Sequence, residues 1–172
     1  MVNTTSQASD KNVREALSLR VPRPTDGVAL HQLVANCPPL DPNSLYCNLL
    51  QCSHFADTAV AAEVDGKLVG FISGYTPPGK PDTLFVWQVA VDASMRGQGL
   101  GGKMLGALVE RTGATWMETT VTLDNAASWG MFRSFARKRG AECEDCGPLF
   151  DRDRHFGGLH DSEHLARLGP FK

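Results

Sequence analysis

The chain has 172 residues and a formal net charge of −2, with 42% hydrophobic and 21% charged residues. This composition is typical of one soluble globular domain with its own core, and it disfavours a nucleic-acid or anionic-membrane surface. No apolar run reaches the length of a membrane span. Because the polar N-terminus also lacks a signal-peptide pattern, we expect a cytoplasmic protein.

The N-terminal third predicts a leader and two helices. We expect residues 1–18 to form a flexible leader and residues 19–172 to form a single domain. Apolar spacing predicts helices over residues 28–34 and 44–54. Residues 37–43 between them contain three prolines, so this segment is predicted as a loop. The predicted apolar side of the second helix consists of Leu45, Leu49 and Leu50.

The middle of the chain predicts strands. Residues 58–64 and 67–75 favour strands, and the Asp65-Gly66 pair between them indicates a tight hairpin turn. Residues 84–91 form a nearly continuous apolar run, which predicts a central strand buried on both faces. A glycine-dense segment at residues 96–102 follows, and it opens an amphipathic helix.

The C-terminal part predicts one more strand and helix before a less regular tail. The strand is expected at residues 116–121, and the helix is capped by Asp124 or Asn125 and stops at Gly140. In the tail we predict strands only at Phe150 and over residues 164–168. The order of elements therefore predicts an α/β domain built on a single sheet.

The five cysteines are expected to be free thiols, because their number is odd and no secretion signal precedes them. Cys143 and Cys146 form one C-x-x-C pair, and His155 and His160 could complete a zinc site. A redox pair would need a thioredoxin-like setting, which the sequence lacks. We therefore predict no metal, with a zinc or redox pair as the alternative.

Residues 96–101 carry the strongest functional signal. Glycine allows a ligand to approach the backbone closely, and the free N–H groups at a helix start attract phosphate. Arg96 adds a positive charge at the same end. The alternative is an ordinary strand-to-helix turn. The spacing fits neither the dinucleotide pattern G-x-G-x-x-G nor the Walker pattern, since Met104 follows Lys103.

The pattern Arg96-x-x-Gly99-x-Gly101 resembles the acetyl-CoA turn of the Gcn5-related N-acetyltransferase (GNAT) superfamily, and residues 125–128 resemble its second acetyl-CoA motif. The resemblance implies a mixed, mostly antiparallel sheet with a splayed central strand pair and flanking helices. It also implies acetyl-CoA as cosubstrate, direct attack by an amine, and a backbone N–H near Gln88 that stabilises the oxyanion. The implied cofactor-binding residues are Gln88, Val89, Ala90, Val91, Arg96, Gly97, Gln98, Gly99, Leu100, Gly101, Asn125, Ser128 and Phe132.

One catalytic feature of that superfamily is missing from the sequence. Many members carry a tyrosine on the helix after the asparagine, where it protonates the departing thiolate. The matching position here is about Phe132, and Tyr46 and Tyr75 lie outside this helix. We therefore expect water or the ammonium proton to serve instead.

Further segments resemble one family within that superfamily, the L-2,4-diaminobutyrate acetyltransferases of ectoine biosynthesis. The likeness runs from about Leu19 to Phe171 and is carried by residues 38–50, 84–91, 118–121, 155–156 and 160–163. It implies transfer of acetyl from acetyl-CoA to the γ-amine of diaminobutyrate, giving the precursor of an osmoprotectant. It also implies a homodimer.

The acceptor site needs acidic groups for ammonium, donors for carboxylate, and a base for the γ-amine. The predicted catalytic residues are Asp41, Trp87 and Glu163. Asp41 and Glu163 are both candidates for the base, and Trp87 is predicted to line the cleft. Glu163 would face an ammonium and His155 the carboxylate. The alternatives are a helix cap for Asp41, core packing for Trp87 and a solvated loop for the tail. The predicted substrate-binding residues are Asp41, Asn43, Tyr46, Trp87, Thr120, His155, Phe156 and Glu163.

Two other functions compete with this hypothesis. A protein or peptide N-acetyltransferase would need an open groove, whereas the predicted acceptor residues indicate a closed, polar pocket. A non-catalytic acyl-CoA sensor would explain the missing helix tyrosine, but it would not need acidic and aromatic acceptor residues.

Overall fold

The computed structural model describes residues 17–172. The predicted leader, residues 1–18, lies outside this range except for its last two residues, and Ser18 already begins a strand. In the described part of the chain, none of the helices is long and apolar enough to cross a membrane.

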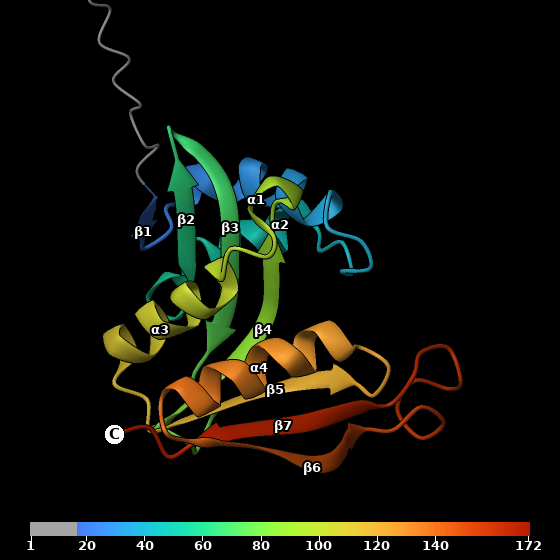
Figure 1. The fold of residues 1–172 in the computed structure, drawn as a ribbon. Coiled ribbons are helices and arrows are strands. Elements are labelled where there is room, and N and C mark those ends of the chain that lie inside the picture. The colour runs from blue at the N-terminus through green and yellow to red at the C-terminus, as the bar shows by residue number, and fades with distance from the viewer. Residues whose placement is uncertain (1–16) are drawn as a thin grey trace, which may run out of the picture.

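Within residues 17–172 the strands form one sheet in the order β1-β2-β3-β4-β5-β7-β6 (Figure 1). Neighbouring strands are antiparallel except β4 and β5, which are parallel. The expectation of a mixed, mostly antiparallel sheet is thus confirmed. The strands are β1 (Ser18–Arg20), β2 (Val60–Val64), β3 (Lys67–Tyr75), β4 (Thr83–Val91), β5 (Trp116–Thr122), β6 (Glu142–Phe150) and β7 (Glu163–Gly169).

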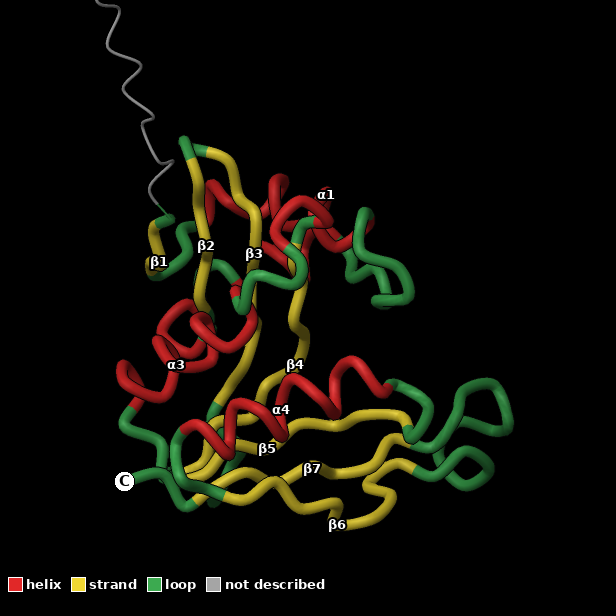
Figure 2. Tube along the Cα trace, viewed as in Figure 1, coloured by secondary structure: helices red, strands yellow, loops and turns green. Residues whose placement is uncertain are grey.

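The helices cover the two arms of this sheet differently. On the arm of β1 to β4, helices α1 and α2 lie on one face and α3 on the other, whereas α4 packs on the arm of β5, β7 and β6 (Figures 1 and 2). One apolar cluster fills the space under α3 and α4, and a smaller one lies under α1 and α2. The helices are α1 (Gly27–Ala35), α2 (Leu45–Gln51), α3 (Leu100–Thr112) and α4 (Ala126–Lys138), with 3₁₀ turns η1 (Pro24–Asp26), η2 (Ala56–Thr58) and η3 (Ala93–Met95).

Local signals predicted several elements well. The hairpin turn between β2 and β3 is tight, with positive φ at Asp65 (49°) and Gly66 (77°), as the Asp-Gly pair indicated. The helix predicted after the glycine segment is α3. Its predicted apolar face is buried, as Met104, Leu105 and Leu108 illustrate.

The predicted apolar side of α2 is wrong. Asn48 and Gln51 are its buried residues, while Leu45 is 40% exposed. The reason is tertiary: α2 packs against α1, and the Asn48 Nδ2 atom lies 3.1 Å from His31 Nδ1. A polar contact between the two helices thus overrides the apolar periodicity of the isolated segment.

The sequence also missed most of β6, since we predicted a strand only at Phe150. β6 is the edge strand beside β7, and most of its residues are exposed or half-buried, so no apolar run marks it. Its pairing with β7 shifts register around Pro148. Proline occurs in sheets at such edges and irregularities, because it cannot donate a ladder hydrogen bond.

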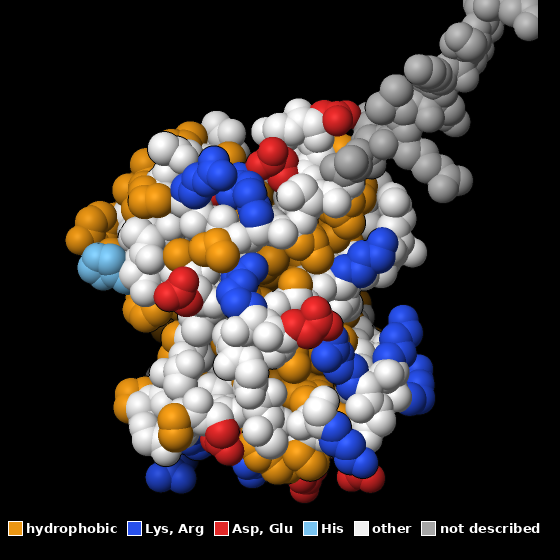
Figure 3. Space-filling model, turned by 90° about the vertical axis from the view of Figure 1, so that its left-hand side faces the viewer, with side chains coloured by type: hydrophobic (Ala, Val, Ile, Leu, Met, Phe, Trp, Pro, Cys, Tyr) orange, Lys and Arg blue, Asp and Glu red, His pale blue; other side chains and the backbone are white. Residues whose placement is uncertain are grey.

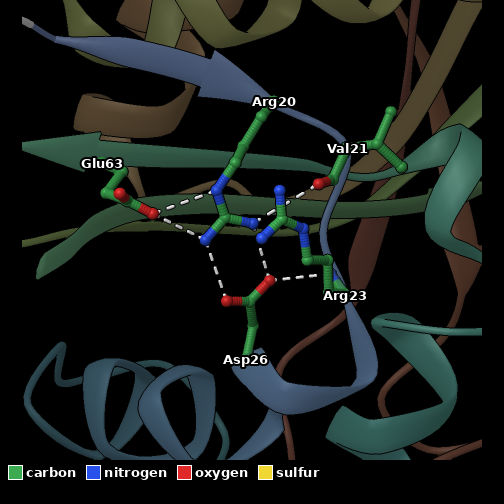
Figure 4. Close-up of polar contacts among 5 residues, drawn as sticks. All are labelled: Arg20, Val21, Arg23, Asp26 and Glu63. Carbon is green, nitrogen blue, oxygen red and sulfur yellow. Dashed lines mark hydrogen bonds and ion pairs between the residues drawn. The ribbon is translucent and has the colours of Figure 1, made fainter. Parts of the chain in front are cut away.

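An ion network fixes the start of the fold (Figure 4). The Arg20 guanidinium on β1 donates to Glu63 on β2 (Nε 3.0 Å, Nη2 2.7 Å) and to both carboxylate oxygens of Asp26 in η1 (2.7 and 2.9 Å). These bonds from Arg20, together with the Arg23 backbone N–H, hold the pKa of Asp26 below its usual range. The network thereby ties the first strand to the turn that leads into α1.

The face beside β1 and α3 carries charged side chains of both signs, interspersed with apolar ones (Figure 3). This mixture agrees with the small formal net charge of −2. The features that distinguish this molecule lie instead where its two arms separate.

Candidate active site

The two central strands separate partway along their length. β5 pairs with β4 only from Thr83 to Val86. At the branch, the buried Thr119 hydroxyl donates to the Val86 carbonyl at 2.9 Å. Beyond Val86, β4 continues beside β3 while β5 runs with β7, so this edge of β4 has no strand partner in the described chain. The predicted splayed strand pair is confirmed.

A β-bulge lies at the point of separation. Gln88 pairs with Ser73 and Val86 pairs with Gly74, which leaves Trp87 as an extra residue on β4. A bulge bends its strand and re-aims the side chain at that position. Trp87 is 48% exposed while Leu84, Val86 and Ala90 are buried, so the prediction that β4 is buried on both faces is wrong at the bulge.

A cavity of about 1060 Å³ occupies the space between the diverging strands. Two loops also line it, residues 37–43 on the arm of β4 and residues 151–162 on the arm of β7. In Figure 1 these are the cyan loop beside α1 and α2 and the orange-red loops at the open side of the sheet. We call residues 88–101 and 125–132 the cofactor wall. The acceptor wall consists of Trp87 and those residues among 37–43 and 150–163 that line the cavity.

The turn before α3 is built by its own hydrogen bonds. Asp92 accepts from the backbone N–H and hydroxyl of Ser94 at 2.9 and 2.6 Å, and these bonds lower the pKa of Asp92. Gly97 and Gly99 have φ angles of 73° and 74°, which only glycine adopts readily. Arg96 lines the cavity, and its Nε donates to the Val91 carbonyl at 3.3 Å. A fixed cation thus lies near the open start of α3.

Only some of the other predicted cofactor residues line the cavity. Gln88, Val89, Val91, Asn125, Ser128 and Phe132 line the cavity. The side chains of Ala90 and Leu100 are buried in the core. A Cβ at Gly101 would lie 2.5 Å from the Met131 Sδ atom, so this glycine lets α3 pack closely against Met131 of α4. Gly97, Gln98, Gly99, Leu100 and Gly101 do not line the cavity, and their cofactor role stays a prediction.

The start of α4 forms the opposite part of the cofactor wall. Asn125 caps this helix by accepting from the Ser128 N–H at 3.0 Å, which settles the choice between Asp124 and Asn125. The cap and first residues of this 13-residue helix, Asn125, Ala127 and Ser128, line the cavity. Like the start of α3, this helix start is suited to anionic groups.

The acceptor wall begins with the proline-rich loop. Gln88 on β4 holds this loop, because its Nε2 donates to the Asp41 carbonyl at 3.0 Å and its Oε1 accepts from Asn43 Nδ2 at 3.1 Å. Asp41 does not cap α2, since Ser44 does. The carboxylate of Asp41 is exposed and lines the cavity. Tyr46 lies outside the lining and is 70% exposed.

The other side of the acceptor wall is the segment between β6 and β7. Phe156 lies against His160, with ring centroids 4.7 Å apart, and both residues line the cavity together with Glu163. The His160 Nε2 atom lies 3.9 Å from Glu163 Oε1. Thr120, on β5, also lines the cavity.

His155 has a local role in this segment and does not line the cavity. Its Nδ1 accepts from the Asp151 backbone N–H at 2.7 Å. The carboxylate of Asp151 accepts from the N–H groups of Asp153 and Arg154 at 3.0 and 2.9 Å, which lowers the pKa of Asp151. Several residues of this segment that were not predicted as site residues also line the cavity, among them Arg152 and Asp161.

The cysteines of this chain are free thiols. Burial raises the pKa of Cys143, and that of Cys52 to about 12, which keeps both thiols protonated at neutral pH. Among residues 17–172 no group of three or more His, Cys, Asp or Glu side chains is arranged to hold a metal ion. The C-x-x-C pair lies along the edge strand β6.

The arrangement has a clear chemical capability. An unpaired strand edge can bind an extended amide-containing chain, and the helix starts beside Arg96 and Asn125 can hold its phosphates. At the other end, Asp41 and Glu163 lie on one cavity with the aromatic Trp87. Such a site suits transfer of an acyl group to an amine.

The fold and the cleft place the molecule in a class. Residues 28–136 match the model of the Acetyltransferase (GNAT) family, and the chain belongs to this family. The structure of the ribosomal-protein-S18-alanine N-acetyltransferase from Escherichia coli superposes with a TM-score of 0.70, covering 91% of this chain and 96% of that one. At 15% identity, that likeness concerns the fold alone.

Nearer relatives narrow the class. The L-2,4-diaminobutyric acid acetyltransferase from Methylotuvimicrobium alcaliphilum is 48% identical, over 95% of this chain and 96% of its own length. The one from Bordetella parapertussis is 51% identical, over 89% of this chain and 84% of its own length. The Paenibacillus lautus diaminobutyrate acetyltransferase, solved with L-2,4-diaminobutyric acid and coenzyme A, superposes with a TM-score of 0.84 at 36% identity, covering 92% of this chain and 97% of that one. The chain belongs to the family of L-2,4-diaminobutyric acid acetyltransferases.

Proposed function

We propose that this enzyme transfers the acetyl group of acetyl-CoA to the γ-amine of L-2,4-diaminobutyrate, giving N-γ-acetyl-L-2,4-diaminobutyrate for ectoine synthesis. The observation that carries the proposal is the single cavity that joins the free edge of β4 to the acidic acceptor wall. The Paenibacillus lautus enzyme with the same fold binds this amino acid and coenzyme A.

The cofactor wall fits coenzyme A by the chemistry of its groups. We infer that backbone groups of residues 88–91 pair with the pantetheine arm, and that Arg96 and the start of α3 hold the pyrophosphate. Acetyl-CoA supplies the activated thioester. A backbone N–H at Gln88 or Val89, beside the bulge, would stabilise the oxyanion that forms on the acetyl carbonyl.

The acceptor wall would bind and deprotonate the amine. A γ-ammonium with a pKa near the lysine value of about 10.4 costs roughly 4 to 5 kcal/mol to deprotonate at pH 7. Asp41 and Glu163 both line the cavity, so either carboxylate can accept this proton, directly or through water. The free amine attacks the thioester carbon, and the thiolate leaves and takes a proton from water or from the attacking ammonium.

Trp87 and Phe156 give the acceptor wall its aromatic surface. Trp87 lies at the bulge beside the expected oxyanion donor, and Phe156 stacks near His160 in the opposite loop. We infer that these rings flank the acceptor and exclude water, while Asn43 and Thr120 offer polar contacts. Tyr46 and His155, which the cavity does not include, are left out of this proposal.

One assay tests the function. The protein is incubated with acetyl-CoA and, separately, diaminobutyrate, ornithine, lysine, glutamate or a peptide, and release of free thiol is followed. We expect turnover with diaminobutyrate to exceed all others. No turnover with diaminobutyrate would refute the proposal, and faster turnover with the peptide would favour a peptide acetyltransferase. Binding of acetyl-CoA without turnover of any acceptor would indicate a sensor.

We also propose a homodimer in the cytoplasm that acts in the response to osmotic stress, which is what the family resemblance implies. Size-exclusion chromatography with light scattering at micromolar concentrations tests the assembly. A single species at the 18.6 kDa monomer mass would reject the dimer.

A further inference from the structure

The acceptor wall must recognise a carboxylate if the proposed function holds. Cationic side chains suit this task. Among the cavity-lining residues in the described chain, only Arg96 and Arg152 are permanently positive. Arg96 belongs to the cofactor wall, where its Nε donates to the Val91 carbonyl. Among the described residues, Arg152 is the one arginine of the acceptor wall that lines the cavity.

The backbone of Arg152 is held by a hydrogen bond, whereas its side chain is exposed and makes only a surface ion pair. Its N–H donates to the Ser162 hydroxyl at 2.9 Å, which ties the start of the loop to its end, one residue before Glu163. The guanidinium contacts Asp161 at 3.4 Å, and the two side chains are 56% and 66% exposed. Such an exposed ion pair contributes little, so the guanidinium can exchange Asp161 for another carboxylate at small cost.

Resting on the proposed function, we infer that Arg152 binds the α-carboxylate of the acceptor and makes the enzyme select an amino acid over a plain diamine. The planar guanidinium can form two parallel hydrogen bonds to a carboxylate. Because Arg152 and Glu163 are tied together through Ser162, the loop presents a cation and an anion to the same cavity. This pairing matches the carboxylate and the ammonium groups of a diamino acid.

The inference replaces the expectation placed on His155. The His155 Nδ1 atom is already bonded to the Asp151 N–H, and the ring does not line the cavity. Arg154 offers a matched control, since it is an exposed arginine of the same loop that also does not line the cavity. Its backbone bond to Asp151 survives replacement of the side chain.

The experiment compares diaminobutyrate with 1,3-diaminopropane, which is the same molecule without its carboxylate. For Arg152→Ala we expect kcat/KM with diaminobutyrate to fall about 10- to 100-fold, as for the loss of charged hydrogen bonds. The activity of Arg152→Ala with 1,3-diaminopropane should stay at the wild-type level. Arg154→Ala should keep wild-type activity with both amines. L-2-aminobutyrate keeps the carboxylate but lacks the γ-amine. As an inhibitor it should bind Arg152→Ala about 10- to 100-fold more weakly than it binds the wild type.

Three outcomes would overturn the inference. The first is an equal loss of kcat/KM with both amines in Arg152→Ala, and the second is the same loss with diaminobutyrate in Arg154→Ala. The third is a loss confined to diaminobutyrate in His155→Ala but not in Arg152→Ala. If Arg152→Ala fails to fold, Arg152→Gln replaces it, and Arg152→Lys should recover part of the preference. A wild-type enzyme that acetylates neither amine refutes the proposed function itself. Turnover of diaminobutyrate with an unchanged preference in Arg152→Ala refutes only the role of Arg152.

Discussion

The two walls of the cleft are built in different ways. The cofactor wall consists of a strand edge and two helix starts, and buried residues such as Val86 and Met104 fix its elements in the larger core. The acceptor wall consists of Trp87 and of side chains on two loops and the adjoining strand ends, of which Asp41 and Arg152 are exposed. Backbone groups can bind a ligand whatever side chains they carry, whereas the side chains of the loops select which acceptor is bound.

The largest effect that we predict lies in the acceptor wall. Whichever of Asp41 and Glu163 is the base, its amide variant (Asp41→Asn or Glu163→Gln) should lose about 10²- to 10⁴-fold in kcat, as for removal of a general base. The KM for acetyl-CoA should not change, because neither carboxylate belongs to the cofactor wall. Steady-state thiol release at saturating acetyl-CoA measures both constants. Near-normal rates in both variants would remove these residues from the reaction.

The second prediction concerns the cofactor wall. Gly99 has a φ angle of 74°, so Gly99→Val strains the turn before α3 by roughly 1 to 3 kcal/mol and should displace it. We expect the KM for acetyl-CoA to rise about 10-fold or more, with the KM for diaminobutyrate unchanged. Gly113→Val is the control, because Gly113 ends the same helix with a φ angle of 64° and open space around it. It should cost similar stability and leave both KM values unchanged. Equal KM changes in the two variants would show that strain, not phosphate binding, matters at Gly99.

The sequence predicted the local backbone features of the cofactor wall but not the strand that positions Arg152, and the reason is physical. The glycine turn and the cap at Asn125 depend on local backbone geometry, which nearby residues determine. The position of Arg152 depends on the edge strand β6, which no apolar run marks. The burial of Asn48 depends on its contact with His31 in another helix. Long-range pairing of this kind leaves no periodic signal in the sequence.

The third prediction concerns the Arg20 network, which should affect the stability of the fold but neither wall of the cleft. Asp26→Asn removes an anion from the Arg20 network and should lower the free energy of unfolding by about 1 to 3 kcal/mol at pH 7. Because the folded state lowers the pKa of Asp26, its contribution is complete above the unfolded value of about 3.9 and is lost as pH falls through the folded pKa. The wild type and the variant should therefore converge in stability below about pH 4.

Urea unfolding between pH 3 and pH 7 measures this convergence. Both KM values at pH 7 should match the wild type, since the network lies outside the cavity lining. A stability difference that stays constant down to pH 3 would exclude the ionised carboxylate as its source. A raised KM for diaminobutyrate would mean that the acceptor loop depends on this network through α1.

The smallest predicted effect tests the residue that belongs to both walls. The backbone of Gln88 lies on the cofactor edge of β4, but its side chain bridges the Asp41 carbonyl and the Asn43 amide of the acceptor loop. Gln88→Ala removes two neutral hydrogen bonds and leaves the strand backbone intact. Since one such bond contributes about 0.5 to 1.5 kcal/mol, the KM for diaminobutyrate should rise about 3- to 10-fold while that for acetyl-CoA stays constant.

A double-mutant cycle sharpens this test. Asn43→Ala removes the partner of Gln88 Oε1, so Asn43→Ala combined with Gln88→Ala should raise the KM by less than the product of the single effects. Gln32→Ala, at an exposed position on α1, should change neither KM. If Gln88→Ala instead raised the KM for acetyl-CoA, its side chain would serve the cofactor. The division between a backbone-built wall and a side-chain-built wall would then fail at the one residue that joins them.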